Sequence, residues 1–330
     1  MFDVGVFRQN FPILNAPVDG KDYYYFDTAA TSLKPRCVAD RIHQYYLYEV
    51  ANIHRGSHYL GRKGTEHFEA VREQSARFIN ARSDQEIIFV KGVTEAINLL
   101  AYSYGQSTTP QDVICVSGFE HHSNIVPWIL LRERNHCQLE VVRFNDDGSI
   151  DDIEIKKLVE KNPKIVSLIL YSNVTGVRFD VEKVLAALKN SSTITIVDAA
   201  QAVLHEPLDV QQLGCDYLTF SAHKMFGPFG TGVLYGKAEL LKELPPFMGG
   251  GSMISQVQWD RLVLQNAPYK FEAGTPNIAD VIGFGETLKF VEKWGVTSWQ
   301  SHTRNLVAQL ESEIQKIPRI DRKSTRLNSS

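Results

Sequence analysis

Lys224 is the residue whose setting best suits covalent chemistry. It lies in the segment Phe220–Tyr235, which reads FSAHKMFGPFGTGVLY, just after the β-rich run Asp216–Phe220. Such a run is typical of a buried strand. A lysine just after the end of a buried strand can be partly desolvated, and desolvation lowers the pKa of its amine. We therefore expect a neutral amine that could form a Schiff base with a carbonyl compound. An incidental lysine in a turn would explain the segment alone equally well. Three glycines would let the backbone approach a bulky ligand: Gly227, Gly230 and Gly232.

A possible phosphate site follows a second strand-like run. The stretch Gly92–Glu95 joins the run Ile87–Val90 to a helical segment. Free amides at a helix N-terminus, with the Thr94 hydroxyl, could receive a phosphate group. A threonine that only caps the helix is the alternative interpretation.

The pair His121-His122 comes after the run Val113–Val116. Two histidines could begin a metal site, but no third ligand lies at a suitable spacing, and we predict no metal. An imidazole that stacks on an aromatic ligand, or that shuttles protons, suits this position better.

Two further runs end in polar residues that could face a ligand. Asn173 follows Ile165–Leu170 and could either stabilise a turn or donate to a ligand oxygen. Asp198 ends a β-branched run, where an ionised carboxylate needs a cationic or donor partner that no neighbour in the sequence supplies. A protonated ring nitrogen would serve, and Gln201 could reach the same ligand.

Together these residues require a ligand with a phosphate, a basic aromatic nitrogen and a carbonyl that reacts with Lys224. Pyridoxal 5'-phosphate (PLP) has all three groups, and a carboxylate at its pyridine nitrogen is the usual way in which a protein tunes it. A nicotinamide-binding sheet is a weaker alternative, because no G-x-G-x-x-G motif follows the first strand.

The elements that must position these residues alternate along the chain. Strands separated by helices indicate an α/β fold with a mostly parallel sheet covered on both faces, and ligands of such sheets bind beyond the carboxyl ends of the strands. A helix is expected over His67–Ala81 before the sheet, and two long helices over Pro276–Trp294 and Thr297–Ile317 after it. The expected strands are 87–90, 113–116, 139–144, 165–170, 194–197, 217–220 and 232–235, and the helices between them are 94–102, 124–134, 152–161 and 181–189.

Composition narrows the class of protein. The 330 residues are 43% hydrophobic and 22% charged, which is ordinary for a globular protein. A net charge of -3 gives no reason to expect nucleic acid as a partner, and no apolar run is long enough for a membrane span. The N-terminus lacks the features of a signal peptide, so we predict a cytoplasmic location. Four scattered cysteines resemble neither a disulfide framework nor a zinc site.

Several long motifs resemble the class V aminotransferase family, and within it the Suf-type (group II) cysteine desulfurase and selenocysteine lyase branch. The resemblance covers about residues 7–317. It implies the PLP-dependent transferase fold of type I, with a seven-stranded sheet between helices. The motifs that carry it are Asn52–His58, Thr94–Asn98, Glu120–Pro127, Ser172–Val174, Asp198–Gln201, Ser221–Lys224, Gly249–Met253 and Phe271–Pro276.

The resemblance implies a role for each matched residue near the cofactor. Lys224 would form the internal aldimine with PLP, Asp198 would pair with the pyridine nitrogen, and His121 would stack on the ring. Gln201 and Asn173 would hydrogen-bond near the 3-hydroxyl group or the substrate.

The remaining matched residues are implied to bind phosphate or to line the entrance. Thr94, Ser221 and His223 would hold the phosphate. In a homodimer, Thr275 would contribute to the phosphate site of the other subunit. The entrance would be lined by His54 and Arg55.

The implied reaction is the desulfuration of L-cysteine to L-alanine, with sulfur passed as a persulfide to an acceptor protein of iron-sulfur cluster assembly. Lys224 would move the α-proton and His121 would assist proton transfer. The family's nucleophilic cysteine loop and its carboxylate-binding arginine do not occur before Ser330. We therefore expect a truncated copy with impaired sulfur transfer. Selenocysteine cleavage, another class V reaction and a non-catalytic PLP-binding remnant are the alternatives.

We expect four regions along the chain. They are an N-terminal segment (1–20), a large PLP-binding domain (21–294), the start of an incomplete small C-terminal domain (295–320) and a foreign-looking tail (321–330) without apolar periodicity.

Overall fold

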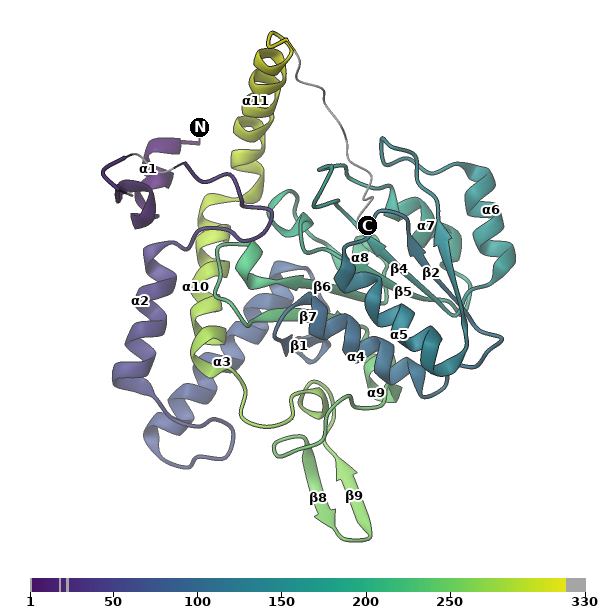
Figure 1. Cartoon of the computed structure of the whole chain (residues 1–330). Helices are drawn as coiled ribbons and strands as arrows, with labels where there is room; N and C mark the ends of the chain where they lie inside the picture. Colours follow the sequence, from purple (N-terminus) through teal and green to yellow (C-terminus); the bar gives the residue numbers. More distant parts are fainter. Residues whose placement is uncertain (1, 18, 22–23, 319–330) are drawn as a thin grey trace.

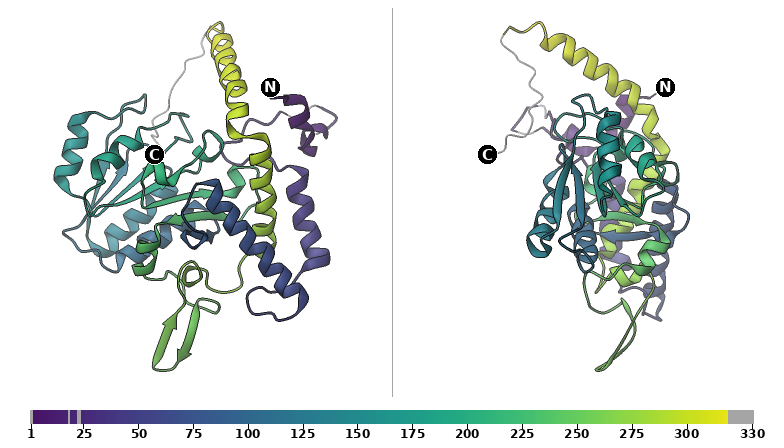
Figure 2. Two further views of the ribbon diagram at one scale, coloured as in Figure 1. Left: turned by 180° about the vertical axis from the view of Figure 1, so that it is seen from behind. Right: turned by 90° about the vertical axis from the view of Figure 1, so that its right-hand side faces the viewer.

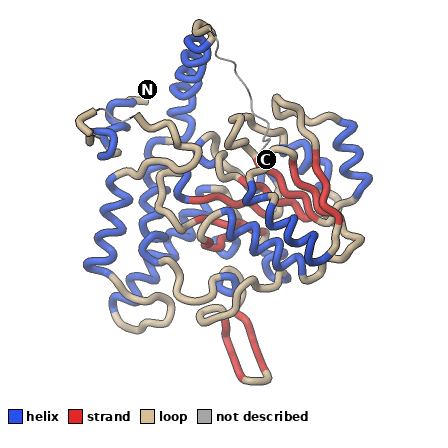
Figure 3. Tube along the Cα trace, viewed as in Figure 1, coloured by secondary structure: helices blue, strands red, loops and turns tan. Residues whose placement is uncertain are grey.

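The computed structural model describes residues 2–17, 19–21 and 24–318. Its centre is a seven-stranded sheet in the order β1-β7-β6-β5-β4-β2-β3, with helices on both faces (Figures 1 and 3). Only β7 runs antiparallel to the strands beside it, so the predicted mostly parallel seven-stranded sheet is confirmed. The strands are β1 (Ile87–Val90), β2 (Val113–Ser117), β3 (Gln138–Val142), β4 (Ile165–Ile169), β5 (Ile194–Asp198), β6 (Tyr217–Ser221) and β7 (Gly232–Gly236).

The helices follow the predicted alternation and divide between the two faces. On one face lie α3, α10, α6, α7 and α8, and on the other lie α4, α5 and α9. The helices are α1 (Val4–Gln9), α2 (Arg36–Gln44), α3 (Tyr59–Phe78), α4 (Val93–Gly105), α5 (Val126–Asn135), α6 (Asp152–Lys161), α7 (Val181–Leu188), α8 (Val210–Leu213), α9 (Ala238–Glu243), α10 (Ile278–Trp294) and α11 (Val296–Ile314). Short 3-10 or π turns cover 12–15, 45–49, 84–86, 122–124, 202–204, 222–224 and 269–271.

The strands alternate their side chains between two hydrophobic cores. On β6, Leu218 and Phe220 pack on the α3/α10 face, whereas Tyr217 packs on the α4/α5 face. Because both faces are covered, the strands read as continuous apolar runs, and this is why they were recognisable in the sequence. Burial on both sides fixes the register of the sheet and therefore the positions of the residues at its carboxyl edge.

Two elements project from this body. The hairpin of β8 (Ile254–Gln258) and β9 (Arg261–Leu264) extends at one end, and α11 extends at the other (Figures 1 and 2). Helices α10 and α11 meet at Gly295, whose φ of 72° suits glycine. The division into domains at 294 stays a prediction, and the tail at 321–330 lies outside the described residues.

The structure corrects some predicted boundaries. The helix expected from His67 begins eight residues earlier, at Tyr59, and it contains Gly61 and Gly64. An added Cβ at Gly61 would lie 3.1 Å from the Cα of Gly56, so close packing requires glycine here despite its low helix propensity. Among the described residues, no helix has both the length and the hydropathy needed to cross a membrane.

Candidate active site

A cavity of about 480 Å³ lies at the carboxyl edge of the sheet, beyond β4, β5 and β6. It brings together eight of the predicted site residues from five separate loops. Its lining is Asp27, Ala29, Ala30, Val93, Thr94, His121, Ser123, Ile169, Asn173, Asp198, Ala200, Gln201, Ser221, His223 and Lys224. Three predicted residues, His54, Arg55 and Thr275, do not line this cavity.

Lys224 follows β6 in the turn 222–224 and is half-buried in the cavity. Burial lowers the pKa of its amine, as the sequence predicts, while the negative charge of Asp198 partly opposes the shift. The Lys224 Nζ makes no hydrogen bond or ion pair with a described residue. The amine is therefore free to meet a ligand, and burial makes it easier to deprotonate than an exposed lysine.

An N-terminal segment holds the Lys224 loop in place, and no pattern in the sequence indicates this contact. The carbonyl oxygen of His223 accepts hydrogen bonds from Thr31, Ser32 and Lys34, at 2.9–3.0 Å for the three side-chain donors. The Ser32 hydroxyl also accepts the amide of Phe226 at 2.6 Å. Both sides of Lys224 are thus tied to a segment about 190 residues away in the sequence.

Asp198 is the last residue of β5 and is only 1% exposed. Its Oδ1 accepts the amide of Ala200 at 2.9 Å, but its Oδ2 has no hydrogen-bond partner among the residues that the structure describes. Burial raises the pKa of the carboxyl to about 6, although the Ala200 amide and the Lys224 charge oppose the shift. A buried oxygen without a donor is costly, and a cationic N–H group of a ligand would remove that cost.

The N-terminus of α4 opens into the same cavity. Gly92 supplies no side chain to cap the helix, and the amide of Val93 donates to Ser221 Oγ at 3.0 Å. The next two amides, of Thr94 and Glu95, donate to no described residue. Free amides and the helix dipole favour an anion, and Thr94 adds an exposed hydroxyl.

The two ring nitrogens of His121 differ in their contacts. Nδ1 is hydrogen-bonded within its own loop, whereas Nε2 has no hydrogen bond with a described residue. The Ser123 amide donates to Nδ1 at 3.2 Å, and the Ser123 hydroxyl lies 2.8 Å from the same atom. Because an amide can only donate, the hydrogen of the neutral ring sits on Nε2. Burial lowers the pKa of His121, with smaller effects of Lys224 and His122, so the ring is neutral near pH 7. No group of three or more potential metal ligands occurs in the described part of the chain.

The two amide side chains are placed differently. Gln201 donates to the carbonyl of Ala29 at 2.8 Å. The turn after β4 is stabilised by Ser172, whose hydroxyl accepts the amides of Val174 and Thr175 at 3.2 Å. Asn173 therefore does not hold that turn, and its side chain lines the cavity without a described partner.

Two of the loop glycines, Gly227 and Gly232, pack closely against other parts of the protein, and the approach of the loop glycines to a ligand stays a prediction. An added Cβ at Gly232 would lie 2.7 Å from the Cα of Gly92, and one at Gly227 would lie 2.8 Å from the Cβ of Ala222. These glycines let backbone segments pack against each other, so they shape the walls of the cavity indirectly.

His54, one of the two residues predicted at the entrance, contacts a cluster of charged side chains centred on the buried Arg72. His54 Nε2 lies 2.7 Å from Glu69, which also binds Arg72 at 2.8 Å. Arg72 is 1% exposed and pairs with Glu272 at 2.6 Å, close in sequence to the exposed Thr275. The cluster thus ties both segments to the sheet, and their functional roles stay predictions.

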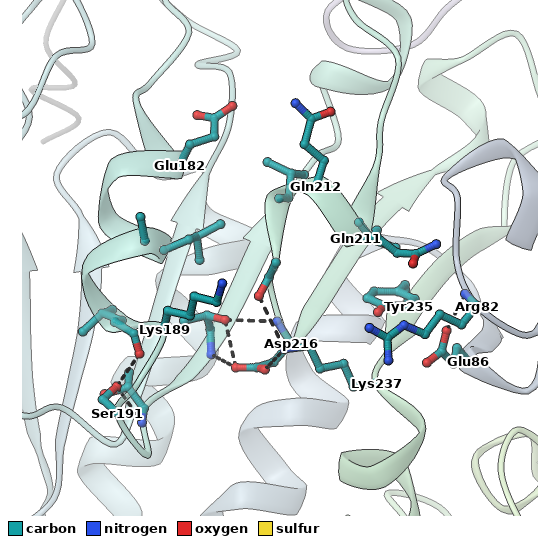
Figure 4. A pocket seen from close by; sticks show the side chains of 18 of the residues that line it. Arg82, Glu86, Glu182, Lys189, Ser191, Gln211, Gln212, Asp216, Tyr235 and Lys237 are labelled. Atoms are coloured by element: carbon teal, nitrogen blue, oxygen red, sulfur yellow. Dashed lines mark hydrogen bonds and ion pairs between the residues drawn. The ribbon is translucent and has the colours of Figure 1, made fainter.

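A larger cavity of about 670 Å³ lies at the opposite edge of the sheet (Figure 4). Charged side chains that line it are paired with other groups of the protein. Asp216, for example, accepts a hydrogen bond from the amide of Thr195 at 2.8 Å and forms an ion pair with Lys237 at 2.7 Å. No histidine or cysteine is found among the described residues that line it. We therefore place the chemistry in the smaller cavity, where unpaired polar groups converge.

The chain is similar in sequence and in fold to several known proteins. The aminotransferase class-V family model matches residues 24–329. A probable cysteine desulfurase of Mycobacterium leprae is 42% identical over 96% of this chain and 52% of its own length. A cysteine desulfurase of Pectobacterium atrosepticum is 40% identical over 94% of this chain and 77% of its own. The apo structure of a cysteine desulfurase from Thermococcus onnurineus superimposes with a TM-score of 0.89 at 34% identity, over 96% of this chain and 77% of that one. The chain thus spans about half the length of the first of these relatives.

Proposed function

Because the chain belongs to the class V aminotransferase family, we propose that it is a PLP-dependent cysteine desulfurase that converts L-cysteine to L-alanine. One observation carries the proposal: the buried Asp198 carboxylate, whose Oδ2 lacks a partner, shares a cavity with the half-buried amine of Lys224. The similarity to cysteine desulfurases over nearly the whole chain supports this reaction class.

The residues present fit PLP. A protonated pyridine nitrogen would give Asp198 Oδ2 the donor that it lacks. The free amides of α4, with Thr94, Ser221 and His223, would hold the phosphate. Lys224 would bond covalently to the aldehyde carbon. His121 would stack on the ring, with Gln201 and Asn173 near the 3-hydroxyl group or the substrate.

Two residues of this chain would move protons during the reaction. Bound PLP would withdraw electrons from the substrate's α-carbon. Lys224 Nζ, with its pKa lowered by burial, would remove the α-carbon proton. His121 would assist through Nε2, the nitrogen that Ser123 leaves free.

None of the four cysteines in the chain is suited to accept the sulfur. None lines the cavity, and burial raises the pKa of each thiol, to about 12 for Cys115 and Cys215. A thiol is a poor nucleophile until it ionises. In our proposal the nucleophile is none of these four residues. A thiolate of the acceptor protein of iron-sulfur assembly attacks the substrate sulfur, the bond between that sulfur and the β-carbon breaks, and the acceptor carries the sulfur as a persulfide.

We also propose that the protein acts as a homodimer. The hairpin carries four apolar side chains exposed to water, and one of them, Trp259, is fully exposed. The other three are Val257, Leu262 and Val263. Exposed apolar groups on a projecting element favour burial against a partner. Thr275, exposed in one subunit, would then reach the phosphate site of the other.

Selenocysteine cleavage is the second candidate, and the absence of a suitable thiol in the cavity favours it. Release of selenium from L-selenocysteine needs no cysteine of the enzyme as acceptor. The two activities share Lys224, Asp198 and His121, so only the products separate them.

The test is to load the purified chain with PLP and to measure alanine formed from L-cysteine and from L-selenocysteine. Desulfurase activity predicts alanine and sulfide from cysteine when an external thiol is present, and no product from Lys224→Ala. Lys270→Gln is the matched control, because Lys270 is another buried lysine with a lowered pKa, outside the cavity. Alanine from selenocysteine alone would favour the second candidate, and bound PLP without alanine from either would refute both.

A further inference from the structure

Glu120 is a buried carboxyl group that directly precedes His121 and does not line the cavity. Its side chain is buried, with 1% of the residue exposed, and it accepts hydrogen bonds from three groups. Ser117 Oγ lies 2.7 Å from Oε1, Asn124 Nδ2 lies 2.7 Å from Oε2, and the amide of Ile169 lies 2.6 Å from Oε1. A buried acid without a cationic partner is unusual, and its position beside the cavity needs an explanation.

The three donors come from places that determine where His121 lies. Ser117 ends β2 and Asn124 stands just before α5, so one carboxyl group joins both ends of the loop that carries His121. Ile169 ends β4 and lines the cavity. Glu120 therefore fixes the His121 loop to the strand beside Asp198.

A second set of hydrogen bonds fixes the orientation of the Asn124 amide. Its Oδ1 accepts from the Trp128 indole at 3.0 Å and from the Ser167 hydroxyl at 2.6 Å. Because an indole N–H can only donate, the amide oxygen must face Trp128 and the NH₂ group must face Glu120. These bonds fix the orientation of the Asn124 amide, and the carboxyl group at position 120 accepts its NH₂ group.

Glu120 is also linked to Asp198. Ile169, which donates to Glu120, is the register partner of Asp198 between β4 and β5. Burial raises the pKa of Glu120 to about 8; its three donors oppose this shift, and the negative charge of Asp198 adds to it. The negative charge of Asp198 therefore acts on Glu120 across the neighbouring ends of β4 and β5.

We propose that Glu120 is a positioning residue that sets the orientation of the His121 ring by closing its loop onto the end of β4. The proposal rests on the proposed function only for what His121 then does. The alternative is a carboxyl group that stabilises the fold without affecting the cavity.

The test is a substitution that breaks the network and a second one that repairs it. In Glu120→Gln, either orientation of the new amide sets its NH₂ group against a donor, Asn124 Nδ2 or the Ile169 amide. In the double variant Glu120→Gln/Asn124→Asp, the new carboxylate can accept from the new amide while still accepting from Trp128 and Ser167. Complementarity is thus restored with the acid moved to position 124.

The readout is the pair of ring-nitrogen NMR signals of His121 in the full chain without cofactor, labelled with ¹⁵N-histidine and assigned by comparison with His121→Asn. Wild type should show an unprotonated Nδ1 and a protonated Nε2. Glu120→Gln should lose this pattern, and the double variant should regain it. Glu86→Gln is the matched control: Glu86 is 3% exposed and accepts the backbone amides of Arg82 and Ala238, away from the cavity.

A folded Glu120→Gln variant with the wild-type His121 signals would overturn the proposal, and so would a folded double variant that does not regain them. If Glu120→Gln does not fold, the double variant alone decides by the same criterion. Loss of the signals in Glu86→Gln as well would also overturn it, because any buried acid would then have the same effect. The cofactor-free readout separates this result from a failure of the proposed enzymatic function.

Discussion

The carboxyl group of Asp198 should make the cofactor-free protein less stable as the pH rises, and Asp198→Asn should remove this effect. Burial raises the pKa of Asp198 from 3.8 to about 6, so the folded state binds its proton more tightly than the unfolded state does. The folded state is favoured while the group is protonated, and that advantage is lost as the pH rises through 6. This is the reverse of the usual behaviour of an ion-paired aspartate.

The size of the effect follows from the shift. About two pKa units correspond to about 3 kcal/mol once the group is ionised in both states. About 2 kcal/mol of this should appear between pH 4.5 and pH 8, because the unfolded carboxyl is already largely ionised at pH 4.5. The substitution leaves an amide NH₂ without a partner, which costs about 1–3 kcal/mol at every pH. The diagnostic quantity is therefore the change with pH rather than the absolute difference.

The assay is urea unfolding of wild type and Asp198→Asn, without PLP, at several pH values from 4.5 to 8. The difference in unfolding free energy should move by about 2 kcal/mol in favour of the variant as the pH rises. Asp216→Asn is the control at the opposite edge of the sheet, because it removes an aspartate that is paired with Lys237 and lies outside the cavity. A constant difference between wild type and Asp198→Asn across this range would refute the reasoning.

Three other predictions concern the buried cluster, the phosphate site and the hairpin. Arg72→Met should lower the unfolding free energy by about 3–5 kcal/mol in urea titrations, because Arg72 is 1% exposed and its loss leaves Glu272 buried and unpaired. A loss below about 1 kcal/mol would contradict this role. Thr94→Ala should weaken PLP binding about tenfold in absorbance titrations, because one hydrogen bond to a charged group is lost. Binding of unphosphorylated pyridoxal should not change. Equal weakening of both would argue against a phosphate contact. Trp259→Ser should shift the protein towards monomer in sedimentation experiments, and an unchanged dimer would exclude the hairpin from the interface.

Most of the cavity could be predicted because its residues follow buried strands. Runs such as Ile194–Asp198 are apolar on both faces, so their ends are visible in the sequence. In a parallel sheet those ends meet at one edge, and this is why Asp198, Asn173 and Lys224 could be grouped before any coordinates were considered. The need of Asp198 for a donor partner followed from its apolar neighbours alone.

The contacts made by irregular segments could not be predicted. The bonds from Thr31, Ser32 and Lys34 to the carbonyl of His223 join residues far apart in the sequence, and a polar turn carries no periodic signal of such a partner. The start of α3 was also hidden, because Gly61 lowers helix propensity locally while the packing against Gly56 requires it.

The hairpin escaped prediction for the opposite reason. Strands β8 and β9 are exposed over most of their residues, so burial imposes no regular alternation of apolar and polar side chains. Their form depends on pairing with each other and, in our proposal, on a second subunit.

The central claim is that Lys224 is the residue to which PLP is bound. The most direct measurement is to load the chain with PLP, reduce it with borohydride and locate the modified lysine by peptide mass spectrometry. We expect a single phosphopyridoxyl group on Lys224 and none on the other half-buried lysine of this region, Lys34, whose pKa burial lowers to about 8. Modification of Lys34 or of any other lysine in place of Lys224, or equal labelling of the Lys224→Ala variant, would contradict it.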